Sequence, residues 1–260
     1  TGAEQAPVQW DGQILVPFSP EAALSGVNRT LQPEQTLWYR RALDVQPRAG
    51  MRLLLHFGAV DQACTVFVNG KRAGAHTGGY TAFTLDITAL LEEQNVLTVA
   101  VRDGTDTNEL SRGKQRTRRG GIWYTPQSGI WQTVWAEWVP ERYISGLRIT
   151  PDAAHGCVRV TVQSEASCAC WLHFQGRRIG GFTNRETVLR VEQPELWSPE
   201  SPHLYEFSAE LGEDTVESYF ALRDVAVGQD AQGRPCLMLN GRPYYHSGVL
   251  DQGYWPDGLY

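Results

Sequence analysis

The residues whose types best suit ligand binding lie in the stretch 120–135. Trp123 and Tyr124 follow a double glycine and precede a turn marked by Pro126 and Gly129. A flat aromatic ring can stack on the apolar face of a sugar ring, but it can equally fill the core of a β-sandwich. Because loop residues often carry function, Trp123 and Tyr124 are candidates for ligand binding.

Two further tryptophans, Trp131 and Trp135, follow in the run 130–139, which is rich in Trp and Val as strands are. This pattern predicts one long strand over 130–139. Large aromatic side chains in a strand are usually buried, so we expect Trp131 and Trp135 to pack in a core.

A basic cluster precedes the aromatic pair and consists of Arg112, Lys114, Arg116, Arg118 and Arg119. A guanidinium group binds a carboxylate through two parallel hydrogen bonds, so Arg118 and Arg119 are candidates for a carboxylate ligand. The alternative is a solvated charged loop, as most charge runs are. The net charge of −6 argues against nucleic acid or an anionic membrane as the main partner.

The cysteines and histidines give little sign of a metal site. The five cysteines are odd in number and sparse, so they imply no disulfide framework. Cys168 and Cys170 lack the second pair that would complete a zinc site. We therefore expect no metal and no cofactor, and a cytoplasmic location, although a secreted mature form stays open.

The rest of the chain predicts short strands separated by turns, which is typical of antiparallel sandwiches. A loop-rich start covers 1–36, and the segment 103–127 is too long for a hairpin turn, so it is functional or mobile. Turns are expected at Asn69-Gly70, Gly176 and Gly180-Gly181. The expected strands are 37–43, 52–57, 64–68, 83–87, 95–102, 130–139, 143–150, 157–164, 170–175, 187–191, 204–211, 216–221 and 237–239.

Several motifs, taken in their order along the chain, resemble glycoside hydrolase family 2. Those that resemble the N-terminal sugar-binding jelly roll are Trp38-Tyr39-Arg40-Arg41, Gly78-Gly79-Tyr80, Asp86-Ile87-Thr88 and Ser128-Gly129-Ile130-Trp131-Gln132. Leu196-Trp197-Ser198-Pro199 resembles the following immunoglobulin-like sandwich, and Leu239-Asn240-Gly241-Arg242-Pro243 resembles the entry to the catalytic barrel. Each motif is weak alone, but the ordered set spans essentially the whole chain.

The resemblance implies an all-β fold. We expect a jelly-roll, galactose-binding-like domain over 1–141 and an immunoglobulin-like β-sandwich over 142–226. A linker and the first strand of a truncated (β/α)8 barrel would then occupy 227–260. The family contains β-galactosidases, β-glucuronidases and β-mannosidases, which are retaining enzymes with two catalytic glutamates on later barrel strands. We therefore expect no catalytic residue in this chain.

The resemblance also implies a place for the candidate site residues. If 244–250 is the first barrel strand, then Asp251, Gln252, Tyr254 and Trp255 follow its end, where barrel enzymes bind their substrates. The loop 103–127 would reach towards that site with Trp123 and Tyr124. Arg118 and Arg119 would pair with a uronic acid or with the barrel. The alternative is a barrel-capping loop without ligand contact, or a loose tail.

Two other kinds of protein stay open. An autonomous carbohydrate-binding module would show an exposed aromatic platform, and a purely structural or interaction domain would bury Trp123 and Tyr124 in packing. The expected partners are a β-glycoside substrate, the missing barrel domain and further copies in a homo-oligomer. The sequence does not name the sugar, because selectivity lies in barrel loops.

Overall fold

The computed structural model describes residues 6–260, which divide into two compact units. The first unit combines Thr1–Trp138 with the C-terminal segment Asp251–Tyr260, and the second is Val139–Leu250. The first five residues of the predicted jelly-roll domain lie outside the described part of the chain.

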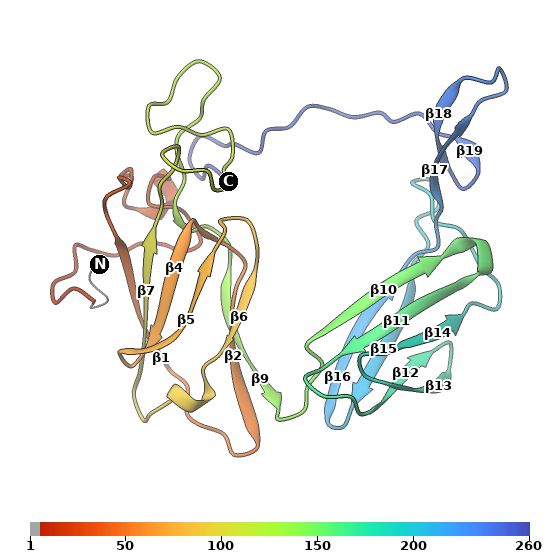
Figure 1. The fold of residues 1–260 in the computed structure, drawn as a ribbon, viewed down its shortest axis with the longest axis horizontal. Coiled ribbons are helices and arrows are strands. Elements are labelled where there is room, and N and C mark those ends of the chain that lie inside the picture. Colours follow the sequence, from red (N-terminus) through yellow and green to blue (C-terminus); the bar gives the residue numbers. More distant parts are fainter. Residues whose placement is uncertain (1–5) are drawn as a thin grey trace. The chain divides into compact units, whose positions relative to one another are not determined.

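The first unit contains two antiparallel sheets packed face to face (Figure 1). One sheet has the order β1-β7-β4-β5 and the other the order β6-β2-β9, while β3 and β8 form a separate pair. The bounds are β1 Leu37–Leu43, β2 Met51–Phe57, β3 Val60–Asp61, β4 Ala63–Val68, β5 Lys71–Thr77, β6 Phe83–Asp86, β7 Asn95–Arg102, β8 Gly129–Ile130 and β9 Val134–Pro140, with 3-10 turns at Ala23–Ser25 and Thr88–Leu90.

The core of this unit lies between the two sheets. Val66 and Val99 from one sheet pack with Leu55 and Phe57 from the other, and all four are almost fully buried. The predicted Asn69-Gly70 hairpin joins β4 to β5, and both residues have positive φ, 53° and 75°. Such a turn matches the twist of the strands it connects.

The predicted single strand over 130–139 is wrong. The chain forms β8 and β9 with a break at 131–133, because β8 pairs with β3 whereas β9 belongs to the sheet of β2. Within the break, the carbonyl of Thr133 accepts a hydrogen bond from the backbone N–H of Gly58 at 2.9 Å. Trp135 is 47 % exposed, so its predicted core position is also wrong, while Trp131 is half-buried.

The second unit is also a sandwich of two antiparallel sheets, with the orders β10-β11-β14 and β13-β12-β15-β16. Its core includes Val158, Val160, Leu172 and Leu189, which come from both sheets. The bounds are β10 Gly146–Asp152, β11 Cys157–Gln163, β12 Ala169–Phe174, β13 Arg177–Phe182, β14 Glu186–Arg190, β15 Tyr205–Leu211 and β16 Asp214–Phe220, with a 3-10 turn at Ala153–His155.

The predicted turn at Gly180-Gly181 is wrong, because both glycines lie inside β13. A Cβ on Gly180 would come within 3.0 Å of the Trp171 ring, and one on Gly181 within 2.3 Å of Oγ1 of Thr187. The glycines are therefore needed for close packing rather than for a turn.

A small sheet of order β17-β18-β19 follows in the second unit, formed by Val225–Gln229, Pro235–Leu239 and Arg242–Pro243. The sequence patterns gave no sign of β17. Residues 244–250 form no strand here, so the predicted barrel stub is not shown. A barrel strand needs neighbours on both sides to pair with.

The prediction of an all-β fold is confirmed. Within residues 6–260, no helix is long and apolar enough to cross a membrane.

Candidate functional site

Side-chain hydrogen bonds hold the backbone of the loop 103–127 in place. Oδ1 of Asp103 accepts a hydrogen bond from the backbone N–H of Thr105 at 2.6 Å, and Oδ1 of Asp106 accepts two from Thr117. Gln115 is 2 % exposed; its Oε1 accepts from the backbone N–H of Gln127 at 2.7 Å. These bonds hold the loop at its start, between residues 106 and 117, and between residues 115 and 127.

Five aromatic rings meet beside this loop and are called the aromatic cluster below. Tyr124 of the loop stacks on Tyr254 of the C-terminal segment, with ring centroids 4.1 Å apart and an interplanar angle of 8°. Tyr260 lies 4.9 Å from both Tyr254 and Trp131, and Tyr80 lies 5.5 Å from Trp131. All five belong to the first unit.

The C-terminal segment is packed onto the first unit rather than loose. The backbone N–H of Leu24 donates to the carbonyl of Asp257 at 3.0 Å. Trp255 and Leu259 exchange two backbone hydrogen bonds, and Leu259 is 8 % exposed. The phenol pKa of both Tyr80 and Tyr254 is raised, first by burial and then by the neighbouring Tyr260.

The predicted site residues of the C-terminal segment differ in their surroundings. Tyr254 lies in the aromatic cluster, whereas Trp255 is 71 % exposed. Oδ1 of Asp251 accepts a hydrogen bond from the backbone N–H of Gly253 at 2.9 Å, and Gln252 is exposed.

The predicted site residues of the loop also differ in their surroundings, since some are packed and others exposed. Tyr124 lies in the aromatic cluster, and Trp123 is half-buried under the guanidinium of Arg116, 3.9 Å from the ring centroid. Arg119 donates to Oγ1 of Thr125 at 3.0 Å. Within residues 6–260, the exposed side chain of Arg118 makes no hydrogen bond and no ion pair. The structure thus brings Tyr124 and Tyr254 together and leaves Arg118 and Trp255 accessible.

Three carboxyl groups are buried in the same unit, and we call them the acidic triad: Glu21, Asp61 and Asp103, at 7 %, 3 % and 2 % exposure. Burial raises the pKa of Asp61 to about 8, with Asp103 and then Glu21 adding repulsion. Burial likewise raises the pKa of Asp103 to about 6 and raises that of Glu21. Sequence reasoning missed this triad; the only local signal was an acidic residue directly after a buried apolar strand residue, at Val60-Asp61.

Glu21 explains part of the Ser128-Gly129-Ile130 motif. Its carboxylate accepts hydrogen bonds from the backbone N–H and the hydroxyl of Ser128, at 3.1 and 2.6 Å, and from the backbone N–H of Leu31 at 2.9 Å. Next along the chain, the backbone N–H of Ile130 donates to the Tyr39 hydroxyl at 3.1 Å. The motif therefore fastens the N-terminal segment and β1 to the end of the loop.

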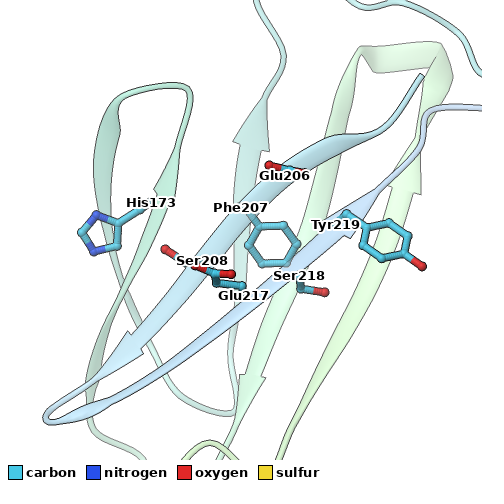
Figure 2. A pocket seen from close by; sticks show the side chains of 7 residues that line it. All are labelled: His173, Glu206, Phe207, Ser208, Glu217, Ser218 and Tyr219. Atoms are coloured by element: carbon cyan, nitrogen blue, oxygen red, sulfur yellow. The ribbon is translucent and has the colours of Figure 1, made fainter.

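A separate hollow of about 440 Å³ lies on the second unit and has no predicted site residue in its lining. Figure 2 shows it between His173 and Tyr219, with Glu206, Ser208 and Glu217 among the lining residues. His173 is held at 2.7 Å by Glu210, which also binds Arg178 at 2.8 Å. Within residues 6–260, this hollow included, no group of three or more His, Cys, Asp or Glu side chains is arranged to hold a metal ion.

Comparison with known families matches both sandwiches. Residues 20–132 match the model of the "Glycosyl hydrolase 2 galactose-binding domain-like" family, and residues 158–223 match that of "Glycosyl hydrolases family 2". Together the two matches cover more than half of the chain. The chain belongs to glycoside hydrolase family 2. Its first sandwich is the galactose-binding-like domain, and its second is the family's following β-sandwich domain.

The curated relatives are family 2 glycosidases. A β-glucuronidase from Bacteroides fragilis is 27 % identical over 85 % of this chain and 33 % of its own length. A β-galactosidase from Bacteroides ovatus is 25 % identical over 92 % of this chain and 30 % of its own length. The chain thus spans about a third of the length of these relatives.

Solved family 2 structures have the same fold. The β-glucuronidase of Faecalibacterium prausnitzii superimposes with a TM-score of 0.70 at 25 % identity. That match covers 93 % of this chain and 45 % of the other.

Proposed function

We propose that this chain is the non-catalytic N-terminal part of a retaining β-glycosidase. In the parent enzyme, the loop 103–127 and the segment Asp251–Tyr260 border the substrate pocket. The stack of Tyr124 on Tyr254 at 4.1 Å carries this proposal, because it joins the sandwich loop to the segment that the family resemblance places at the pocket edge.

The three buried carboxyl groups of the first unit do not form a catalytic pair. A retaining glycosidase needs two carboxyl groups about 5–5.5 Å apart that both reach the sugar. The acidic triad is at most 7 % exposed, so none of its members can reach a sugar. Because the family resemblance implies that the catalytic glutamates lie on later barrel strands, we propose that both lie outside this chain.

The accessible site residues have the chemistry of sugar recognition. Trp255, 71 % exposed, offers a ring face to a pyranose, and Asp251 and Gln252 offer hydrogen bonds to hydroxyl groups. Arg118 offers a guanidinium to a carboxylate, either of a uronic acid or of the catalytic domain. Trp123 and Arg119 support this loop through Arg116 and Thr125.

Exposed apolar side chains on the second unit favour the hypothesis that another domain of the parent enzyme packs against it. Val225, Val227 and Leu237 are 63 %, 76 % and 46 % exposed on the small sheet, and Val249 and Leu250 follow at 94 % and 88 %. Val225, Val227 and Leu237 lie on two paired strands of one sheet, and exposed apolar surface of this kind is typical of a surface that another protein body covers. We propose that the catalytic barrel covers this one.

The test compares this chain with the full-length protein from the same source. We expect the full-length protein to hydrolyse nitrophenyl β-glycosides and the 260-residue chain to show no turnover above buffer. Turnover by the chain alone would refute its non-catalytic role. A full-length protein without β-glycosidase activity would refute the proposed parent activity.

An autonomous carbohydrate-binding module is the second candidate. It is favoured by Trp135, which is exposed on β9 and stacks on His56 with centroids 4.9 Å apart. Titration calorimetry of the chain with a panel of oligosaccharides decides this. Heat of binding that disappears in Trp135→Ala would support the module, and no heat with any sugar would exclude it.

A further inference from the structure

We propose that Asp61 is a positioning residue that stays protonated in the folded unit at neutral pH and, in this uncharged form, packs against the turn Gly78–Tyr80, which carries Tyr80 of the aromatic cluster. The inference rests on the proposed function, because the aromatic cluster is the part of the chain proposed to border the substrate pocket. It adds a mechanism that keeps those rings in place.

The geometry places Asp61 against this turn. Asp61 pairs with Gly129 in the β3–β8 ladder, and its side chain is 3 % exposed. A Cβ on Gly79 would come within 2.1 Å of Oδ1 of Asp61, so the carboxyl group lies directly against the Gly79 backbone. The carbonyl of Gly79 in turn accepts the indole N–H of Trp131 at 2.8 Å.

The neighbouring residue fixes the start of the same turn. The carbonyl of Gln62 accepts a hydrogen bond from the N–H of Gly78 at 2.8 Å. The turn is therefore held at Gly78 by a backbone hydrogen bond, at Gly79 by the Trp131 indole with the Asp61 side chain packed against it, and at Tyr80 by the aromatic cluster.

Within residues 6–260, no ion pair and no hydrogen bond compensates a negative charge on the Asp61 side chain. Its Oδ1 has no hydrogen-bond partner. The titratable groups that face it are Asp103, Glu21 and the phenol of Tyr80, none of which becomes a cation. The nearby Arg102 directs its Nε to Oγ1 of Thr36 at 3.0 Å instead. Within residues 6–260, no ion pair involves a member of the acidic triad.

A buried carboxyl group without a cationic partner keeps its proton, because burial disfavours the charged form. The pKa of Asp61 accordingly rises from its usual 3.8 to about 8. The ionised form would place a charge beside Asp103 and Glu21 and against the Gly79 backbone. We therefore expect ionisation to loosen the turn and the rings above it.

The direction of the pH effect follows from proton linkage. Between pH 3.8 and about 8 the folded chain holds a proton on Asp61 that the unfolded chain has released. Stability therefore falls as pH rises through this window, with the folded-to-unfolded ratio dropping about tenfold per pH unit for one proton, and it levels off above the folded pKa. Asp103 and Glu21, whose pKa values are also raised, add slopes of the same sign at lower pH.

The experiment uses the 260-residue chain and its Asp61→Asn variant, which keeps the shape of the side chain and cannot ionise. We measure the urea-unfolding midpoint of the first unit from about pH 6.5 to 9, and the hydrogen-exchange protection of the Trp131 indole. In the unmodified chain both should fall as pH rises towards 8, and in Asp61→Asn this fall should be absent. Above pH 8 the buried Cys64 thiol, whose pKa burial raises to about 12, lowers the stability of both proteins alike. Equal pH profiles for the two proteins would overturn the proposal.

Asp86→Asn serves as the matched control. Asp86 lies in the same unit, where Thr88 and Arg52 lower its pKa, so it stays ionised throughout this pH range. Its variant should keep the pH profile of the unmodified chain. If it instead lacks the fall towards pH 8, as Asp61→Asn should, the effect is not specific to Asp61 and the proposal fails.

A direct titration tests the protonation state of Asp61 even if the Asp61→Asn variant does not fold. Carbon-13 NMR of the Asp61 carboxyl in the unmodified chain should give a midpoint near pH 8, and a midpoint near 4 would overturn the proposal. In Asp103→Asn the midpoint should move to lower pH, because the nearest repelling charge is gone; an unchanged midpoint would refute the electrostatic argument. No sugar enters these measurements, so their outcome is independent of the glycosidase test.

Discussion

At the scale of single residues, two glycines of the family motifs lie where the backbone passes against another side chain. A Cβ on Gly129 would come within 2.1 Å of the Tyr39 hydroxyl, and Gly129 also has a φ of 77°. A Cβ on Gly79 would collide with the Asp61 carboxyl at the same distance. Both glycines therefore bring the chain close to a buried polar group, and neither role is visible in the local sequence.

Gly79→Ala should destabilise the first unit by about 1–3 kcal/mol, the usual result of adding atoms to a filled site. Gly12→Ala is the matched control, because a Cβ there meets nothing within 4 Å. Urea unfolding of both variants measures the difference. Equal stability of the two variants would show that Asp61 moves aside without cost.

At the scale of elements, the aromatic cluster fastens the C-terminal segment to the first unit. Tyr254 links the loop to the end of this segment, because its ring contacts both Tyr124 and Tyr260. The adjacent Trp255 contributes its backbone hydrogen bonds to Leu259 but leaves its own ring 71 % exposed. The two neighbouring residues thus have different roles, one in docking and one facing outward.

Tyr254→Ala should loosen the segment Asp251–Tyr260, because the variant lacks the ring that stacks on Tyr124 and contacts Tyr260. Hydrogen exchange of the Leu259 amide should accelerate at least about tenfold, which corresponds to a loss of about 1.4 kcal/mol. Trp255→Ala should leave that exchange rate unchanged. If both variants exchange alike, stacking on Tyr124 does not hold the segment.

Local patterns predicted strands such as 37–43 and 95–102, because one alternating face of each packs in a core. They failed at 131–133, where β8 and β9 pair with different sheets and the strand is interrupted. They also failed at Gly180, where the Trp171 ring on the neighbouring strand β12 leaves room only for glycine. The acidic triad could not be predicted, because it forms from segments some 40 residues apart. The stack of Tyr124 on Tyr254 joins two predicted site residues 130 positions apart, yet their contact with substrate stays a prediction.

At the scale of the whole molecule, the chain is two family 2 sandwiches with exposed surfaces of two kinds. The first unit offers Arg118 and Trp255 beside a packed aromatic cluster. The second offers the apolar side chains of the small sheet and of Val249 and Leu250. We propose that the apolar surface of the second unit binds the catalytic domain and that the surface of the first unit borders its substrate pocket.

The most direct test of this account is the kcat/KM of the full-length enzyme on nitrophenyl β-glycosides after Trp255→Ala. Tyr219→Ala on the second unit is the control, because that ring is also exposed, at 62 %. We predict a loss of at least about tenfold, or about 1.4 kcal/mol of transition-state stabilisation, for Trp255→Ala and none for Tyr219→Ala. Equal kcat/KM values for the two variants would contradict the placement of this segment at the substrate pocket.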